Sequence, residues 1–443
     1  MTGNLNLDSG AFLDVSGREV KLGDTRLETD GGSIALTSEA GRIGLAAGAT
    51  LKLGGERGGT LEIAAPGGAF EWTGNIDARG TQAGGRFGLD IAATGSVGTL
   101  GALGSRLRQA GFTDAIRLNA SRGDWNLAAG DSLEARRLSL ATGAGSLDVE
   151  GTLRAEGSGA AVELRASDRL RLADTARVWV HGTAEQSGRL MLDATTEDGG
   201  DSRGIQVDRG AHIDVSSLTG GANGSVELRA PRQGADVAVQ GNLGAAIGGA
   251  GETTVEAVRT YRTTGTITEH QIASWKSDTD AFMANADAIE SRLHLPGGLR
   301  PELSVIGSGD LTLAGSGWDL AEWRYGGRPG VLSLAAAGNL AIEGKLSDGF
   351  RDNPQGLDLG NGRFVAINDQ LQTGASWSYR LLAGQDVRIG NDTLVRTGAG
   401  RIEVIAGRDF VLGNAGSALY TLGRPDDTQR YGTLKPGGVA KLL

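Results

Sequence analysis

The chain has 443 residues, of which 75 are Gly and none is Cys, and its formal net charge at pH 7 is −10. The absence of Cys excludes disulfide scaffolds, Cys-ligated zinc sites and thiol catalysis. Charges of both signs are interspersed without a run of Lys and Arg, so we expect no nucleic-acid binding. No apolar run approaches the roughly 18 residues needed to cross a bilayer, so we expect no membrane-spanning segment.

The segment GAFLDVSG at 10–17 is nearly repeated as GAHIDVSS at 210–217. A repeated segment indicates a repeated structural unit. Short alternating segments that follow a Gly recur along most of the chain, as in GSVELRA at 224–230. The alternation places Val226 on one face and Glu227 on the other, which is typical of a half-buried strand.

Short strands separated by Gly-rich corners fit a sandwich, a barrel or a solenoid. The solenoid is favoured because the spacing persists, the segments resemble one another, and the inward positions carry Val, Ile, Leu and Ala rather than aromatic residues. We therefore predict an all-β fold, a right-handed parallel β-helix. Its segments are predicted over 1–251 and 301–443, the second with a polar loop near 347–363.

Residues 252–300 break this strand pattern. Thr268 and Gln271 have the spacing of a capping box, and the apolar residues that follow recur at intervals of three and four. These features predict an amphipathic helix that ends before Pro296. We interpret this range as one α-helical insertion that packs against the coils, with a partner-binding helix as the alternative.

Three blocks of the C-terminal half carry a family resemblance: 307–350, which includes GVLSLAAAGNLAIEG, 376–387, and 395–424. They resemble the filamentous-haemagglutinin family, large secreted exoproteins of two-partner secretion in Gram-negative bacteria. The resemblance implies a secreted β-helical shaft at the bacterial surface, with no catalytic residues and no cofactor. It also implies an outer-membrane transporter as export partner, and a host-cell receptor or surface glycan as binding partner.

The secretion domain of that family, with its Asn-Pro-Asn-type motifs, has no counterpart here, because the single Asn-Pro pair is Asn353-Pro354. The first thirty residues also lack the apolar segment of a secretory signal. We therefore expect this chain to be an interior or C-terminal piece of a longer exoprotein.

The tripeptide Arg122-Gly123-Asp124 matches the motif that integrins recognise on exposed loops. It lies at a predicted corner between two strands, where exposure is expected. An ordinary Gly-Asp turn is the alternative interpretation.

The chain also offers candidates for enzymatic chemistry, because parallel β-helices include polysaccharide lyases and hydrolases that use clustered carboxylates. One acidic run supplies Glu197, Asp198, Asp201, Asp208 and Asp214, together with His212. Solvated corners and strand faces explain these residues equally well, and we expect no enzyme activity.

No metal site is expected. The four imidazoles are far apart in the sequence and form no metal-ligand spacing: His181, His212, His270 and His294. The segment GGANGSVEL at 220–228 resembles a calcium-binding nonapeptide, but it lacks the Asp at the sixth position and does not recur in tandem.

Three aromatic residues near the start of the C-terminal segment, Trp318, Trp323 and Tyr325, are candidates for stacking on sugars. The alternative is that they cap a coil or cover the helical insertion. The sequence as a whole predicts a non-enzymatic adhesive shaft segment. A polysaccharide lyase or hydrolase and the stalk of a contact-dependent toxin-delivery exoprotein remain open alternatives.

Overall fold

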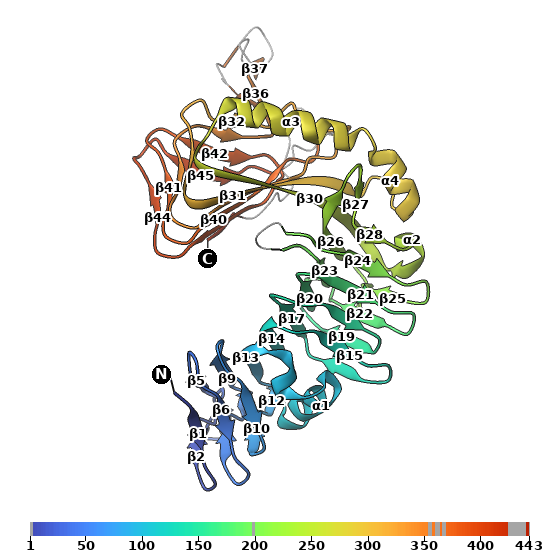
Figure 1. Ribbon diagram of the computed structural model, residues 1–443. Helices are drawn as coiled ribbons and strands as arrows, with labels where there is room; N and C mark the ends of the chain where they lie inside the picture. Colours follow the sequence, from blue (N-terminus) through green and yellow to red (C-terminus); the bar gives the residue numbers. More distant parts are fainter. Residues whose placement is uncertain are drawn as a thin grey trace. The chain divides into compact units, whose positions relative to one another are not determined.

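The computed structural model describes residues 3–196, 200–352, 357–358, 364–365, 369–423 and 440–442. Short parallel strands stack coil upon coil, so the chain is an all-β parallel β-helix with a small helical insertion, as the sequence predicts (Figure 1). The chain divides into two compact units. Unit 1 comprises Met1–Pro231, Ala238–Val255 and Ser291–Leu295, and unit 2 comprises Arg232–Val237, Glu256–Glu290 and Pro296–Leu443.

Each coil of unit 1 contributes one longer strand to a parallel sheet, here called the long sheet. Its strands are β5 (Ser33–Thr37), β9 (Thr60–Ala65), β13 (Arg86–Ala93), β14 (Ala115–Arg122), β17 (Arg137–Thr142), β20 (Ala161–Ala166), β23 (Arg189–Asp193) and β26 (Gly224–Gln233). Leu118 lies beside Leu140, which lies beside Leu164 and then Leu192, and each is at most 1% exposed. The core is thus a set of columns in which one inward residue of each coil stacks on its equivalent in the next.

Short strands complete each coil on its other faces. The first three coils contain β1 (Leu5–Leu7), β6 (Ile43–Leu45) and β10 (Phe70–Trp72) in one sheet, and β2 (Phe12–Asp14), β7 (Thr50–Lys52) and β11 (Asn75–Asp77) in another. A third short sheet of these coils contains β8 (Gly55–Arg57) and β12 (Gly80–Ala83). The antiparallel hairpin of β3 (Glu19–Leu22) and β4 (Thr25–Glu28) precedes this sheet in the chain.

The later coils of unit 1 have two short sheets. One contains β15 (Trp125–Leu127), β18 (Leu147–Val149), β21 (Arg169–Leu172), β24 (Gly204–Val207) and β28 (Val239–Gln240). The other contains β16 (Ser132–Glu134), β19 (Thr152–Glu156), β22 (Arg177–His181), β25 (His212–Asp214) and β29 (Ile247–Gly248). Gly48 and Gly130 allow the tight turn between short strands, with φ of +88° and +87°.

The nearly repeated segment of the sequence is the same structural unit in two coils. β2 and β25 are both short strands that end in Asp, and the amide of the Ser two residues later donates a hydrogen bond to that carboxylate. The distances are 3.0 Å for Ser16 to Asp14 and 2.9 Å for Ser216 to Asp214. The repetition in the sequence therefore corresponds to a strand and turn of the same geometry in both coils.

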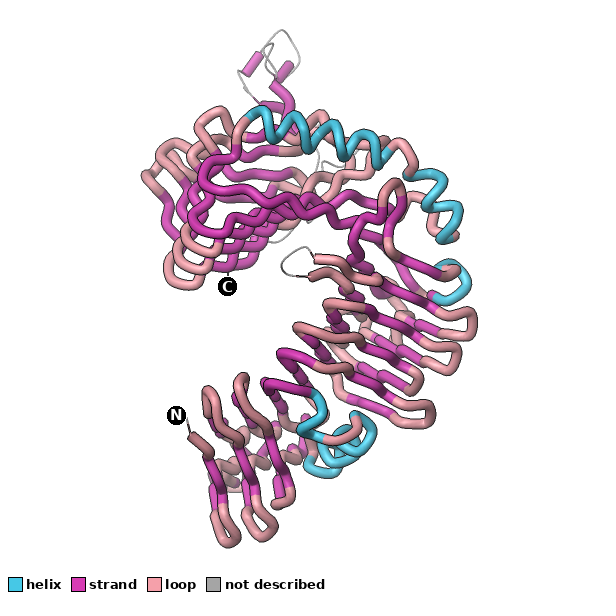
Figure 2. The backbone as a smooth tube through the Cα atoms, viewed as in Figure 1, coloured by secondary structure: helices cyan, strands magenta, loops and turns pink. Residues whose placement is uncertain are grey.

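A helix that the sequence analysis did not predict interrupts unit 1. α1 (Leu100–Ala110) lies between β13 and β14, begins at the N-cap Thr99 and ends at Gly111, whose φ is +89°. It buries Leu103 and Leu107 against the coil interior. The helix occupies the part of its coil where the neighbouring coils have short strands, while the long sheet continues past it (Figure 2).

Unit 2 repeats the coil architecture. Its long strands are β31 (Leu299–Leu313), β33 (Val331–Ala336), β40 (Ser378–Ala383), β43 (Ile402–Ala406) and β46 (Ala440–Leu442). A second row of stacked strands contains β34 (Leu340–Ile342), β41 (Val387–Ile389) and β44 (Phe410–Leu412). A third row contains β32 (Trp318–Asp319), β35 (Leu346–Ser347), β42 (Leu394–Thr397) and β45 (Ala418–Thr421). All these pairs are parallel.

The range 252–300 is helical only in its second part. β30 (Ala250–Ile267), rich in Thr and Val, occupies the first part as a strand, as β-branched residues favour. α3 (Glu269–Met283) begins with the predicted capping box, in which the Gln271 amide donates to the Thr268 hydroxyl at 3.3 Å and the Thr268 amide donates to the Gln271 side chain at 2.9 Å. The backbone turns at Asn285, so that a second helix, α4 (Ala286–Leu293), follows as a separate element. The side-chain amide of Asn285 donates a hydrogen bond to the Ala281 carbonyl.

The predicted polar loop near 347–363 lies partly outside the described residues, as does Asn353-Pro354. In its described part, β36 (Phe350–Asp352) pairs antiparallel with β39 (Asp369–Leu371), and β37 (Leu357–Asp358) pairs antiparallel with β38 (Phe364–Val365). These antiparallel pairs depart from the parallel stacking of the coils.

Candidate functional site

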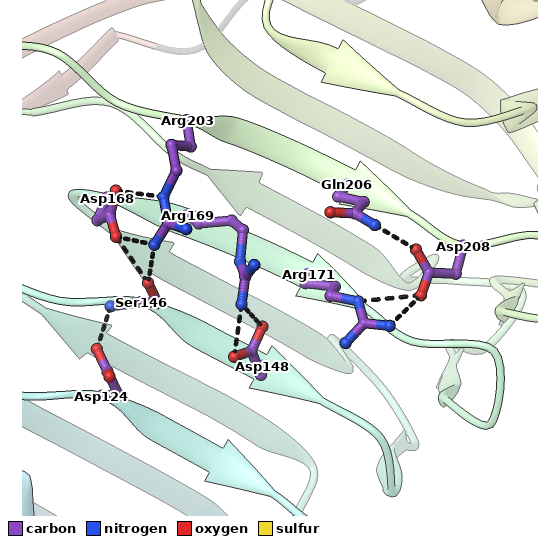
Figure 3. Close-up of polar contacts among 9 residues, drawn as sticks. All are labelled: Asp124, Ser146, Asp148, Asp168, Arg169, Arg171, Arg203, Gln206 and Asp208. Carbon is purple, nitrogen blue, oxygen red and sulfur yellow. Dashed lines mark hydrogen bonds and ion pairs between the residues drawn. The ribbon is translucent and has the colours of Figure 1, made fainter.

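The sheet formed by β15, β18, β21 and β24 has an apolar inner face and a charged outer face. Leu147 and Leu170 lie in register on the inner face and are at most 1% exposed. Asp148 and Arg171 lie in register on the outer face. The alternation of each strand therefore turns a row of charges toward solvent, and we call this row the polar ladder (Figure 3).

Arg and Asp side chains of neighbouring coils pair along the polar ladder. The Arg169 Nη2 atom lies 2.9 Å from both carboxylate oxygens of Asp148. Arg171 donates to one Asp208 oxygen from Nε at 3.0 Å and from Nη2 at 2.6 Å, and Gln206 donates to the other oxygen at 2.7 Å. The two Arg–Asp contacts join residues that are a coil apart, so these charges tie neighbouring coils together, whereas Gln206 and Asp208 belong to the same coil.

A second line of contacts follows the corner beside this sheet. The Ser146 amide donates to Asp124 at 2.7 Å, and the Ser146 hydroxyl donates to Asp168 at 2.9 Å. Arg203 then donates from Nε to Asp168 at 2.8 Å. The hydrogen bond from Arg203 is the main cause that lowers the pKa of Asp168 below its ordinary value.

Asp124, the last residue of the tripeptide Arg122-Gly123-Asp124, lies at the first end of this line (Figure 3). Arg122 is the last residue of β14, Gly123 turns the chain with φ of +94°, and Trp125 begins β15. Arg122 and Asp124 are exposed, as expected for a corner. One carboxylate oxygen of Asp124 is nevertheless engaged by the Ser146 amide of the next coil, so the residue also has a structural role.

Trp318 and Trp323 do not form the surface proposed for sugar stacking. They are 2% and 4% exposed, and Trp318 packs against Trp323 and against Trp275 of α3 with ring centroids 5.7 Å apart in each case. Tyr325 is half-buried, its ring lies 6.5 Å from that of Trp377, and burial raises the pKa of its phenol above the ordinary value. Trp318 thus packs against the helical insertion, which is the alternative interpretation of the sequence, and Trp323 packs against Trp318.

The acidic run is divided between two sheets. Asp208 belongs to the polar ladder, whereas Asp214 lies on β25, where its Oδ2 is 3.3 Å from His181 Nε2. Burial raises the pKa of Asp214, but the Ser216 hydrogen bonds and His181 outweigh it, so that the pKa is lowered. Asp201 is exposed, and Glu197 and Asp198 lie outside the described residues.

The neighbourhood of His181 was not predicted. His181 Nδ1 lies 3.5 Å from Glu156 on one side, while Asp214 lies on the other, and the adjacent Trp179 ring is covered by the Arg154 guanidinium at 4.0 Å. The other three imidazoles, on His212, His270 and His294, are exposed. Among the described residues no group of His, Asp or Glu side chains has the geometry to hold a metal ion.

The pairing in the polar ladder does not follow from local sequence, because its partners are far apart in the chain. Asp148 and Arg169 are separated by 21 positions, and Arg171 and Asp208 by 37. Such residues lie side by side because one full coil of chain separates them. The number of residues in a coil varies along the chain, so the sequence spacing of the partners varies as well.

No helix in the described part of the chain is both long enough and apolar enough to cross a bilayer. The chain matches no protein-family model, no curated protein and no solved structure. These comparisons therefore do not assign the chain to the family that its sequence resembles.

Proposed function

We propose that this chain is a non-enzymatic structural segment of a secreted bacterial adhesin, in which stacked coils present corner segments for attachment to host cells or surface glycans. Export through an outer-membrane transporter of the two-partner type is part of this proposal and is supported by the sequence resemblance alone. The stacked coils then hold the exposed corners, and the corners attach to host cells or surface glycans.

The pairing of outward charges from coil to coil is the observation that carries the proposal. Asp148, Asp168 and Asp208 each accept hydrogen bonds from an Arg. A catalytic pair of carboxylates needs two groups that converge on one substrate, whereas these carboxylates are occupied by their neighbours along the stack. Such pairing supports a role in holding coils in register.

The exposed corner at Arg122 and Asp124 is the best candidate for attachment. The Ser146 amide of the next coil holds Asp124 in place through one carboxylate oxygen, and the charged Arg122 side chain is exposed beside it. A recognition motif held by a rigid scaffold loses less conformational entropy on binding than a mobile loop does.

The proposal is tested by attachment of beads coated with the purified chain to epithelial cells and to glycan-coated surfaces. Asp124→Asn removes the carboxylate charge but keeps an oxygen that accepts the Ser146 hydrogen bond. We expect saturable attachment, and we expect this variant to reduce it by about tenfold or more, which corresponds to 1.4 kcal/mol.

The matched control is Asp201→Asn, which makes the same change at an exposed residue of unit 1. This variant should attach as well as the parent chain. Attachment no greater than that of beads coated with an unrelated protein would refute the adhesive role. Equal loss in both variants would refute the assignment to the corner.

A further inference from the structure

His181 lies between two carboxylates that belong to the coils on either side of it. The three residues are the last residues of β19, β22 and β25, which are neighbouring strands of one sheet (Figure 1). Nδ1 of His181 lies 3.5 Å from Glu156 Oε1, and Nε2 lies 3.3 Å from Asp214 Oδ2. The His181 side chain is 16% exposed, so each ring nitrogen faces a carboxylate rather than bulk water.

A neutral imidazole cannot attract both of these carboxylates. It has one N–H donor and one nitrogen with a lone pair, whereas the imidazolium has two donors. A neutral ring at this position therefore directs a lone pair at one carboxylate oxygen. Nε2 of His181 is buried, and its contact with Asp214 lacks hydrogen-bond geometry. Protonation gives the ring a donor and a positive charge toward both neighbouring coils.

On the side of the preceding coil, one cation accompanies the carboxylate. Arg154 of β19 donates to Glu156 from Nη1 at 3.0 Å, and its guanidinium covers the Trp179 ring of β22. Arg177, the other charged residue on the outer face of β22, donates to the Gly210 carbonyl at 3.0 Å. Glu156 therefore lies between Arg154 and His181.

On the side of the following coil, the carboxylate has no such cation beside it in β25 or β29. Asp214 accepts from the Ser216 amide at 2.9 Å, and the residue in register with it on β29 is Gly248. His212, at the other end of β25, is exposed. The ring of His181 thus faces two carboxylates and one guanidinium, and carboxylates this close favour the charged form of an imidazole.

The identity of the donor distinguishes this contact from the polar ladder. The coil-to-coil pairs of the polar ladder use Arg, which keeps its charge at every accessible pH. An imidazole changes its charge between about pH 5 and pH 8. The contact at His181 is therefore sensitive to pH in a range in which the ladder is not.

Two exposed corner segments begin directly after the residues of this contact. Gly182 follows His181, and its carbonyl accepts from the Leu218 amide at 3.0 Å. The Ala184 amide donates to the Thr219 hydroxyl at 3.0 Å. The segments 184–187 and 218–223 are exposed. The strand ends at His181 and Asp214 thus hold two corner segments that also contact each other.

We propose that His181 is a pH-sensitive clamp, in which the imidazolium holds the coils of β19, β22 and β25 together and the neutral ring releases this hold. The stabilisation is present at mildly acidic pH and is lost as the pH rises through the range in which the imidazole loses its proton. The two corner segments are then held more firmly at the lower pH. This clamp is separate from the corner at Arg122 and does not depend on the attachment proposed above.

Hydrogen exchange of the full chain, followed by mass spectrometry at about pH 5.5 and about pH 8, tests the clamp. The rate of each segment is divided by the intrinsic rate of an unstructured peptide at the same pH. We expect the protection of β22 and β25 to fall by about threefold to tenfold at the higher pH. The protection of β14 and β17, which lie nearer the start of unit 1, should stay unchanged.

His181→Gln is neutral at both pH values and should abolish this difference. His212→Gln, the matched change at an exposed imidazole of the neighbouring strand, should preserve it. Asp214→Asn removes one carboxylate charge but keeps an oxygen that accepts from Ser216, and it should reduce the difference. Far-UV circular dichroism verifies that each variant keeps its strands, and Asp214→Asn decides the question if His181→Gln does not fold.

Three results would overturn the clamp. The first is protection of β22 and β25 that is equal at both pH values, or greater at the higher one, in the parent chain. The second is a pH difference that persists unchanged in folded His181→Gln or in Asp214→Asn. The third is a difference that disappears in His212→Gln, because it would then arise from an exposed imidazole rather than from the bridge.

Discussion

Asp114 shows how a single carboxylate joins neighbouring coils. It is 8% exposed and precedes β14, and it accepts hydrogen bonds from Arg86 Nε at 2.7 Å and from Arg136 Nε at 2.8 Å. Burial raises its pKa, but the two Arg side chains outweigh burial, and the pKa of Asp114 lies below its ordinary value. The ionised form is therefore the one that the folded state stabilises.

This pKa shift predicts a pH dependence of stability. Because the folded pKa is below the unfolded value, the contribution of Asp114 is present above the unfolded pKa of about 3.9 and is lost as the pH falls through the lower folded pKa. Asp114→Asn should lower the free energy of unfolding by about 1–3 kcal/mol at pH 7, and the difference from the parent should shrink below about pH 4. Urea unfolding followed by circular dichroism at both pH values measures this.

The control is Asp24→Asn in the exposed turn of the β3–β4 hairpin, which should change stability by less than about 0.5 kcal/mol. A loss in Asp114→Asn that is equally large at pH 7 and at pH 3 would contradict the ionic role of Asp114.

At the scale of elements, the start of α3 depends on its capping box. The Thr268 hydroxyl accepts from the Gln271 amide, and Trp275, one turn further along, packs into the core of unit 2. Thr268→Ala should lower the stability of this helix by about 1 kcal/mol, because a backbone donor loses its partner. The fluorescence of the Trp cluster during urea unfolding should report the loss as a lower midpoint.

Thr268→Ser provides the matched comparison, because it keeps the hydroxyl that accepts this hydrogen bond. We expect it to retain most of the stability of the parent. If Ala and Ser variants lose the same amount, the methyl group rather than the cap determines the effect, and the prediction fails.

The strands could be predicted from the sequence, whereas one helix could not. Alternation identifies segments such as β26 because one side chain in two enters the core. α1 contains Gly101 and Gly104, which lower its helix propensity. In the sequence these two residues resemble the Gly residues that form the corners between strands. The structure explains both: a Cβ at Gly101 would lie 2.1 Å from the Asp131 carboxylate, and one at Gly104 would lie 2.8 Å from the Ser132 carbonyl oxygen.

The candidate site was predictable to a smaller extent than the fold. The corner position of Arg122 and Asp124 follows from the strands on either side, because a Gly-Asp pair between two alternating segments marks a turn. The burial of Trp318 depends on Trp275 of α3, and the pairing of Asp208 depends on Arg171 in the preceding coil. Contacts of this kind are set by how coils stack and not by local sequence.

At the scale of the whole molecule, stability should vary with position along each stack. A coil in the middle has neighbours on both sides, as β20 has in β17 and β23, whereas β1 pairs with β6 alone in the described structure. In repeat proteins stability is approximately a sum of terms between nearest neighbours, so a coil at the end lacks one such term. Local opening should therefore be easiest at β1 and β2 and at β44 and β45.

Hydrogen exchange followed by mass spectrometry measures this gradient. At low concentration we expect backbone amides of β1, β2, β44 and β45 to exchange at least about a hundredfold faster than those of β17, β20 and β23, since opening free energies range from near zero to the global value. Equal protection of edge and middle coils in the dilute chain would contradict the nearest-neighbour account, because it would mean that the coils open only together.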